Sequence, residues 1–576
     1  MRYTLRITGE SGQGINSIGE ILTKALKNSG YYTFGYREYP SLIKGGIAMY
    51  QLEISDEPVN STTTYADLMF SLSRYSMHHY ARTLKPGSHI FHTFSRNMWS
   101  KEVSADIKSI EPKVYELNAE EQTILAGGTK LMVNVYIMGY IWDLLGQELE
   151  KLTEQVMIHY AKKTELMEAN ISVLNSGYST EKETGRYQLT PSSESTDKYA
   201  VMTGNQSVAL GAYSAGCRAF YAYPMTPASS VLTTLAEMSH ETGMLIKQAE
   251  DEITAAQMML GSMYVGTRAM TGTSGGGFDL MTESLSLAGM AEIPAVFLLA
   301  QRPGPATGLP TWTSASDLDL AIYSGHGEFP RVVLTLSDTK DSFHLTRKAF
   351  DIAEKYQLPV IILTDKHLAE SLYLTDELHA DSEIERGLEV DVPENSYRYV
   401  FTKDGISPRW LPGTSEQVYV TNSDEHTMDG SSTEDMEVAK AMYDKRLLKI
   451  EAVLDALPEP IFTGDGSSKY LVISYGSPVT VVREVIDKIN KKNGNRDIAL
   501  LQYEYLYPLR TEKLHEICKS GVKVIFVEQN ATGQFERLVH TKLNTEPNFE
   551  ILDSFRKYDG KPIFFDEMYN FLSKYR

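Results

Sequence analysis

Residues 295–311 read AVFLLAQRPGPATGLPT, which is an unbroken apolar run, then an arginine, then a loop rich in proline and glycine. A short apolar run without alternation is typical of a strand buried on both faces of a mostly parallel sheet. A second run of this kind, PVIIL at 359–363, follows a helical pattern. Strands that alternate with helices predict an α/β domain from about Tyr199 to Val390.

Arg302 comes directly after the first of these strands. Ligands of open α/β sheets bind at the carboxyl ends of the strands, so the guanidinium is expected at a ligand-binding edge. An arginine in that place suits a bidentate bond to a carboxylate. An ordinary surface ion pair is the alternative interpretation.

Three shorter motifs precede this arginine: YPMTP at 223–227, EDEITAA at 250–256 and TSGGG at 273–277. Two prolines bracket Thr226 and fix the backbone around its hydroxyl. The glycines at 275–277 let a ligand approach the backbone closely. Glu252 stands at the start of a helical pattern, where a solvated carboxylate favoured by the helix dipole is the simpler interpretation. Together the motifs indicate a binding site.

The chain opens with a strand pattern at Tyr3–Thr8, a glycine-rich turn at 9–14 (GESGQG) and a helical pattern from Ile15. This order is typical of an α/β nucleotide-binding layout. The turn reads GxxGxG and therefore departs from the GxGxxG dinucleotide fingerprint. It could hold a phosphate at the helix N-terminus, or it could be a tight turn without a ligand.

The whole chain is predicted to be a multidomain α/β protein. In its last part, strand patterns at Tyr470–Tyr475 and Val522–Glu528 flank a helical pattern at Val479–Lys492. Changes in composition divide the sequence into an N-terminal domain at 1–187, a polar linker at 188–198, a second domain at 199–390, a connecting segment at 391–467 and a C-terminal domain at 468–576.

Charge and composition exclude several kinds of partner. The 576 residues carry a net charge of −20, which argues against nucleic acid or an anionic membrane surface, because both require basic patches. No apolar run approaches the roughly 18 residues that cross a bilayer, and the N-terminus lacks the apolar core of a signal peptide. A cytoplasmic protein is expected. Two cysteines, Cys217 and Cys518, cannot hold a four-thiolate iron–sulfur cluster, so another chain must carry any such cluster.

Several long motifs resemble, in the same order, those of the α subunit of 2-oxoacid:ferredoxin oxidoreductases. Between 223 and 331 they are YPxTP, EDE, TSGxG, QRxGPxTGLPT and GHGEFPR. The turn at 12–14 and the loop at 38–46 resemble the γ domain of that family, here fused at the N-terminus. Segments at 405–413, 424–426 and 527–534 resemble the rest of the α subunit, so the resemblance covers nearly the whole chain.

The resemblance implies a chemistry and a set of partners. The family oxidises 2-oxoacids with thiamine diphosphate and coenzyme A to CO₂, an acyl-CoA and reduced ferredoxin. The second domain should be of the pyrimidine-binding thiamine diphosphate type, and the last should resemble the transketolase C-terminal domain. A β subunit is expected to hold the diphosphate, Mg²⁺ and a [4Fe–4S] cluster, with no metal in this chain. A dimer of αβ heterodimers is the expected assembly.

The same resemblance implies roles for particular residues. Glu252 matches the carboxyl that hydrogen-bonds the pyrimidine nitrogen of the cofactor, and it is the expected catalytic residue. Thr226 and Arg302 match positions that bind the carboxylate of the substrate. Further cofactor contacts are expected from Tyr223, Pro224 and Gly275, and coenzyme A contacts from Gly12, Gln13, Gly14, Gly45 and Gly46.

A Gly-Asp-Gly run at 464–466 resembles the diphosphate signature of other thiamine enzymes. A strand pattern follows it almost at once, where the signature needs a helix N-terminus facing the phosphate. We therefore expect a surface turn at this place.

The sequence departs from the family pattern at Ser314-Ala315, where a Glu-Gln pair is common, and at Gly276, where proline is common. These changes put the substrate in doubt more than the reaction. The fused γ–α order and the segment at 405–413 favour 2-oxoglutarate, with pyruvate or branched-chain 2-oxoacids as alternatives. A nicotinamide-dependent dehydrogenase, a self-sufficient transketolase-like enzyme and a non-catalytic scaffold are the rival interpretations.

Overall fold

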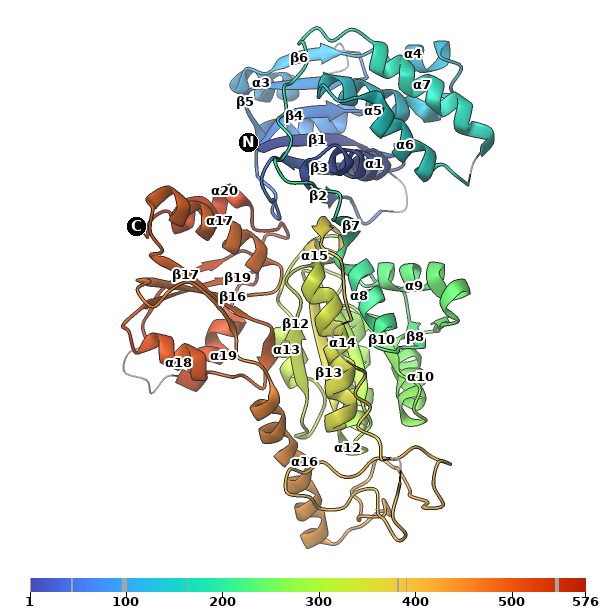
Figure 1. The fold of residues 1–576 in the computed structure, drawn as a ribbon, viewed down its shortest axis with the longest axis vertical. Coiled ribbons are helices and arrows are strands. Elements are labelled where there is room, and N and C mark those ends of the chain that lie inside the picture. Colours follow the sequence, from blue (N-terminus) through green and yellow to red (C-terminus); the bar gives the residue numbers. More distant parts are fainter. Residues whose placement is uncertain are drawn as a thin grey trace. The chain divides into compact units, whose positions relative to one another are not determined.

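The chain forms two compact units in a computed structural model (Figure 1). The first unit comprises 1–202, Glu370–Glu377 and Phe564–Met568, and the second comprises the remainder. The structure describes residues 2–42, 45–95, 101–162, 164–380, 383–389, 391–543 and 549–575, without the side chains of 101–104 and 106.

The first unit contains an eight-stranded mixed sheet in the order β6-β5-β4-β1-β3-β2-β14-β7. Strand β1 runs antiparallel to β3 and parallel to β4. The strands are β1 (Arg2–Glu10), β2 (Tyr32–Glu38), β3 (Ile47–Ser55), β4 (Ala66–Ser71), β5 (Leu84–His92), β6 (Lys113–Glu116), β7 (Ala200–Thr203) and β14 (Leu372–Thr375). The helices are α1 (Ile15–Asn28), α2 (Arg74–Tyr80), α3 (Lys101–Ile110), α4 (Ala119–Leu125), α5 (Val133–Leu144), α6 (Leu149–His159) and α7 (Met167–Ser179).

The alternation of side chains along β1 explains why both faces of this sheet are covered. Leu5 and Ile7 point into the apolar core that α1 and α5 complete. Arg6 lies on the opposite face, where its guanidinium is buried and donates to Oε1 of Gln51 at 2.6 Å and 2.9 Å. The predicted strand, turn and helix at the N-terminus are confirmed, with β14 added to the sheet from a distant part of the chain.

Within the described residues, no single helix is both long enough and apolar enough to cross a membrane. Only a bent pair, Ala119–Leu125 with Lys130–Leu144, passes such a test by length and composition.

The second unit holds the strand at 295–301 at the centre of a seven-stranded sheet in the order β18-β12-β13-β11-β10-β8-β9. All neighbours from β12 to β9 are parallel, as predicted, and β18 is antiparallel. Helices α8 and α14 pack together, α14 against β11 and β13, while α10 packs against β8 and β10. The strands are β8 (Ala219–Ala222), β9 (Leu245–Gln248), β10 (Ala269–Thr273), β11 (Ala295–Gln301), β12 (Val332–Thr335), β13 (Pro359–Asp365) and β18 (Tyr505–Tyr507).

The helices around this sheet begin and end at α8 (Gly204–Ser214), α9 (Ser229–Thr242), α10 (Glu252–Tyr264), α11 (Gly275–Leu280), α12 (Thr282–Met290), α13 (Leu318–Tyr323), α14 (Thr339–Tyr356) and α15 (Lys366–Glu370). Helix α10 presents small buried residues, Ala255 and Ala256, to the sheet. These let the start of the helix lie close to the ends of the strands.

A five-stranded sheet in the order β15-β17-β16-β19-β20 follows near the C-terminus. The run at 464–466 lies in the turn between β15 and β16, where Asp465 accepts a hydrogen bond from the Ser467 amide at 2.8 Å. The expected surface turn is confirmed. The elements are α16 (Met436–Ala456), β15 (Ile461–Thr463), β16 (Tyr470–Tyr475), α17 (Pro478–Asn493), β17 (Ile498–Tyr503), α18 (Glu512–Cys518), β19 (Lys523–Glu528), α19 (Gln534–Leu543), β20 (Ile551–Arg556) and α20 (Phe565–Leu572).

A buried carboxylate anchors α16 within the second unit. Glu292 lies 2.6 Å from Nζ of Lys445 and 2.5 Å from Nζ of Lys449, and all three side chains are at most 1% exposed. Burial alone would raise the pKa of Glu292, but the charges of the two lysines and of Arg398 outweigh burial and lower it well below the usual range. The stabilisation that comes from the lowered pKa of Glu292 is lost as the pH falls into the acid range. Burial lowers the pKa of Lys449 to about 7 despite the charge of Glu292, so the positive charge of Lys449 is lost as the pH rises above neutral.

Replacing Lys449 by methionine is expected to destabilise the second unit by about 3–5 kcal/mol, because removing one partner leaves a buried charge incompletely paired. The measurement is the midpoint of urea unfolding followed by tryptophan fluorescence. Lys440→Met is the matched control on the same helix, since its partner Asp444 is exposed and the pair contributes about 0.5 kcal/mol or less. Equal midpoints for the two variants would contradict an anchoring role for the network.

Candidate active site

The motifs singled out in the sequence meet at the carboxyl edge of the seven-stranded sheet. Strand β8 leads into Tyr223–Thr226, β10 into Ser274, and β11 into Arg302. The connection after β8 goes to β9 on one side, and the connection after β10 goes to β11 on the other. The edge between β8 and β10 is therefore a topological switch point, where ligands of open α/β sheets bind.

Glu252 is the first residue of α10 and is only 4% exposed. Asp251 caps this helix by accepting the Thr254 amide at 2.7 Å, which fixes where Glu252 begins the first turn. Its Oε1 is buried and has no hydrogen-bond partner among the residues that the structure describes. A buried carboxylate oxygen without a partner is costly, so this atom points to a missing ligand.

Gly277 provides the space that Glu252 occupies. A Cβ at Gly277 would lie 2.7 Å from Oε1 of Glu252 and 2.0 Å from Oγ1 of Thr273. A Cβ at Gly276 would meet nothing within 4 Å. Packing therefore requires glycine at 277, whereas a side chain at 276 would meet no other part of the described chain.

Arg302 and Thr226 lie together, as the sequence predicted. Nη1 of Arg302 donates to the main-chain carbonyl of Thr226 at 2.8 Å, so the contact uses the backbone and leaves the hydroxyl of Thr226 for other partners. Burial lowers the pKa of Arg302, although a guanidinium stays charged. Tyr223 is 41% exposed and Pro224 is exposed beside them.

Asp317 also reaches this edge, and no motif in the sequence predicted it. The amide of Asp317 donates to Oε1 of Gln301 at 2.9 Å, and a Cβ at Gly275 would lie 3.1 Å from its Oδ2. Burial and the nearby charge of Asp279 raise the pKa of Asp317 to about 6, against the opposing charge of Arg302. In the sequence, an aspartate before a helical pattern predicts an ordinary N-cap. The contact between Asp317 and Gly275 is visible only in the folded structure.

In the first unit, the glycine turn and the loop at 45–46 lie side by side. The amide of Ser11 donates to the carbonyl of Gly46 at 3.0 Å. Gly12 and Gly14 have φ of 97° and 75°, a backbone conformation that favours glycine. Gly14 is the N-cap of α1, whose first turn holds no acidic side chain, so its free amides can face an anion.

The side chain of Gln13 closes this turn, because its Oε1 accepts the amide of Glu10 at 2.7 Å. Gly45 also has a left-handed φ, of 76°. Lys44, part of the same predicted loop, lies outside the described residues.

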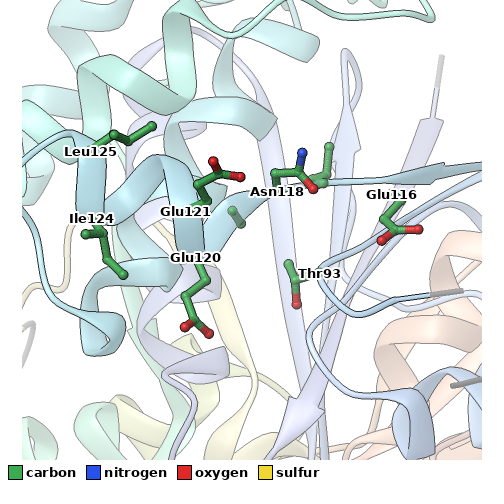
Figure 2. Close-up of a pocket in the computed structure, with 9 residues that line it drawn as sticks. Thr93, Glu116, Asn118, Glu120, Glu121, Ile124 and Leu125 are labelled. Carbon is green, nitrogen blue, oxygen red and sulfur yellow. The ribbon is translucent and has the colours of Figure 1, made fainter. Parts of the chain in front are cut away.

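A cavity of about 470 Å³ lies elsewhere in the first unit, beside the carboxyl end of β6 (Figure 2). Carboxylates dominate its polar lining, with Glu116 from β6 and Glu120 and Glu121 from α4. Because like charges repel, this cavity does not suit the phosphates of a nucleotide. The glycine turn is the better candidate for an anionic ligand.

Known proteins share the whole arrangement of the chain. A family model described as pyruvate flavodoxin/ferredoxin oxidoreductase, thiamine diP-bdg, matches residues 210–445, and one described as pyruvate ferredoxin/flavodoxin oxidoreductase matches residues 4–180. The 2-oxoacid:ferredoxin oxidoreductase subunit alpha of Sulfolobus sp is 32% identical over 635 residues, which cover 100% of this chain and 97% of that protein. The chain belongs to this family of alpha subunits.

Other members of the family give a similar result. The 2-oxoglutarate synthase subunit KorA of Archaeoglobus fulgidus is 32% identical, over 58% of this chain and 88% of that protein. The solved 2-oxoglutarate:ferredoxin oxidoreductase from Magnetococcus marinus, with 2-oxoglutarate, coenzyme A and succinyl-CoA bound, is 28% identical with a TM-score of 0.89, over 100% of this chain and 99% of that chain. The predicted family, its oxidoreductase class and the multidomain α/β fold are confirmed. Membership of this family excludes the interpretation of the chain as a nicotinamide-dependent dehydrogenase.

Proposed function

We propose that this alpha subunit holds the aminopyrimidine of thiamine diphosphate and oxidises 2-oxoglutarate to succinyl-CoA within a larger complex. The observation that carries the proposal is the unpartnered Oε1 of Glu252, buried at the switch point of the sheet. Thiamine diphosphate, when bound, supplies the nucleophilic carbon that attacks the keto group and takes up the electrons left by decarboxylation.

Glu252 is the catalytic residue of this proposal. Its Oε1 would carry a proton toward the ring nitrogen of the pyrimidine, and that hydrogen bond would satisfy the buried oxygen. Tyr223 and Pro224 follow β8, Gly275 begins α11 at the same carboxyl edge, and the three would enclose the ring. Because Asp251 caps α10, the position of Glu252 at the start of the helix is set before any ligand binds.

Arg302 and Thr226 would hold the carboxylate next to the keto group of the substrate. The guanidinium keeps several donors free beyond its bond to the Thr226 carbonyl, and the hydroxyl of Thr226 can donate to the same carboxylate. A carboxylate fixed in this way would orient the keto carbon toward the cofactor.

Coenzyme A would place a phosphate group at the glycine turn of the first unit. The amides of Gly12, Gln13 and Gly14 precede α1, and the carbonyl of Gly46, which follows Gly45, accepts the amide of Ser11 in the same turn. No acidic side chain in the first turn of α1 opposes an anion there. The acidic cavity of Figure 2 offers no comparable place.

A β subunit would complete the complex. This chain has two cysteines, both buried, too few for a four-thiolate cluster. The partner would bind the diphosphate and Mg²⁺, carry the [4Fe–4S] cluster and pass electrons to ferredoxin, in a cytoplasmic dimer of αβ heterodimers. The boundaries at 187, 198, 390 and 467 stay predictions that limited proteolysis of the complex can test.

Substrate choice is tested by steady-state turnover of the native complex with coenzyme A and an artificial electron acceptor. We expect kcat/KM for 2-oxoglutarate to exceed those for pyruvate and 2-oxoisovalerate by at least about tenfold, since one extra ion pair contributes roughly 1.5–3 kcal/mol. A higher value for pyruvate would reassign the substrate within the family. No turnover of any 2-oxoacid would support a non-catalytic scaffold.

A further inference from the structure

The feature that the proposed function leaves unused is the carboxyl group of Asp317. Its Oδ2 is buried and has no hydrogen-bond partner in the described part of the chain. It packs against Gly275, two residues before Gly277, which lies against Glu252. A buried carboxyl oxygen without a partner, at the edge of a ligand site, requires an explanation.

The charges that face Asp317 come from two elements. Arg302, at the end of β11, attracts the carboxylate, and Asp279, on α11, repels it. Asp319, on α13, is engaged elsewhere, because its Oδ2 lies 2.5 Å from Nη2 of Arg537. Arg302 is the only cation that acts on Asp317 among the described residues. The amide of Asp317 donates at 2.9 Å to Oε1 of Gln301, the residue before Arg302, which holds Asp317 at the end of β11.

We propose that Asp317 is a positioning residue that competes with the carboxylate of the 2-oxoacid for the charge of Arg302, so that substrate binds more tightly when Asp317 is protonated. The inference rests on the proposed role of Arg302. In the free enzyme a charged Asp317 balances the guanidinium. When the substrate carboxylate arrives, two negative groups would share one cation, and the buried one takes up a proton because it has the weaker solvation.

This competition makes the KM for the 2-oxoacid rise with pH. The 2-oxoacid is ionised throughout the neutral range, while the pKa of free Asp317 lies at about 6. Below that pH the carboxyl is already neutral and binding takes up no proton. Above it, each bound substrate takes up one proton, so KM rises with pH by up to about tenfold per unit.

The test compares KM and kcat of the complete complex between pH 6 and 8 for wild type, Asp317→Asn and Asp319→Asn. We expect the KM of wild type and of Asp319→Asn to rise with pH, while the KM of Asp317→Asn stays flat and at pH 8 is at least about fivefold below wild type. Taking the ratio of wild type to variant at each pH cancels any titration of the cofactor or of the partner. Asp279→Asn should shift the rise in KM to lower pH, because it removes a repelling charge.

A flat KM for wild type, or the same slope for Asp317→Asn as for wild type, would overturn the inference. If Asp317 had a purely structural role, Asp317→Asn would lower kcat or raise KM at every pH. That result would also contradict the inference. If wild type shows no 2-oxoacid turnover at all, the proposed function is wrong, and the inference that rests on it is wrong as well. That result is distinct from a wild-type enzyme that turns over with a pH-independent KM.

Discussion

Glu252→Gln is expected to lower 2-oxoacid turnover of the complete complex by at least about a hundredfold while the fold stays intact. Glutamine keeps the size of the side chain and its ability to hydrogen-bond, but it has no carboxyl proton to share with a ring nitrogen. The substitution should cost little stability, because Oε1 has no partner within the described chain that could be lost. The measurements are turnover under saturating substrate and the unfolding midpoint.

The neighbouring carboxylate supplies the matched control. Glu250 lies two residues earlier and is exposed, so Glu250→Gln changes the net charge equally without touching the buried edge. Turnover of this variant should stay within about twofold of wild type, as is usual for surface substitutions. If Glu252→Gln kept full turnover, Glu252 would have no part in the mechanism, and a scaffold role would gain support.

Two adjacent glycines test the same claim by geometry. Gly277→Ala would place a methyl group 2.7 Å from Oε1 of Glu252 and 2.0 Å from Oγ1 of Thr273, so both side chains must move. A displacement of about 1 Å can cost roughly a hundredfold in rate. Alanine at 276 meets nothing within 4 Å and should leave turnover nearly unchanged. Equal turnover of the two variants would show that the position of Glu252 does not matter.

Local patterns in the sequence were sufficient to predict the strands and the edge of the sheet at which the site lies. The apolar run at 295–299 became the core of β11, and Arg302 came to its carboxyl end, because strand direction and the βα order leave few alternatives. The turn at 464–466 was read correctly from the strand that follows it. Both features depend on residues that are close together in the sequence.

Features that depend on distant segments could not be predicted. Strand β14, at 372–375, pairs with β2 through Leu372 and Gly35, more than three hundred residues apart, and its short sequence carries no sign of the partner. The packing of Gly277 on Glu252 and the burial of Asp317 behind Gly275 arise in the same way. Each is a contact between segments that follow different strands, which only the assembled sheet brings together.

Arg302→Ala is expected to lower kcat/KM for every 2-oxoacid by about 10- to 150-fold, because the lost charge-assisted bonds contribute roughly 1.5–3 kcal/mol. All 2-oxoacids share the carboxylate next to the keto group, so pyruvate and 2-oxoglutarate should suffer alike. The loss should appear mainly in KM if the guanidinium binds ground state and transition state equally, and in kcat if it acts mainly in the transition state. Steady-state kinetics with both substrates separate these cases.

Arg496→Ala is the control for this experiment, since Arg496 is exposed in the turn after α17 and the change removes the same charge. The decisive comparison is between the substrates. If 2-oxoglutarate alone lost efficiency and pyruvate did not, Arg302 would read the distal carboxylate of a dicarboxylic acid. The carboxylate beside the keto carbon would then need another partner. Asp317 would in that case compete with the distal carboxylate of a dicarboxylic acid, and not with the carboxylate that all 2-oxoacids share.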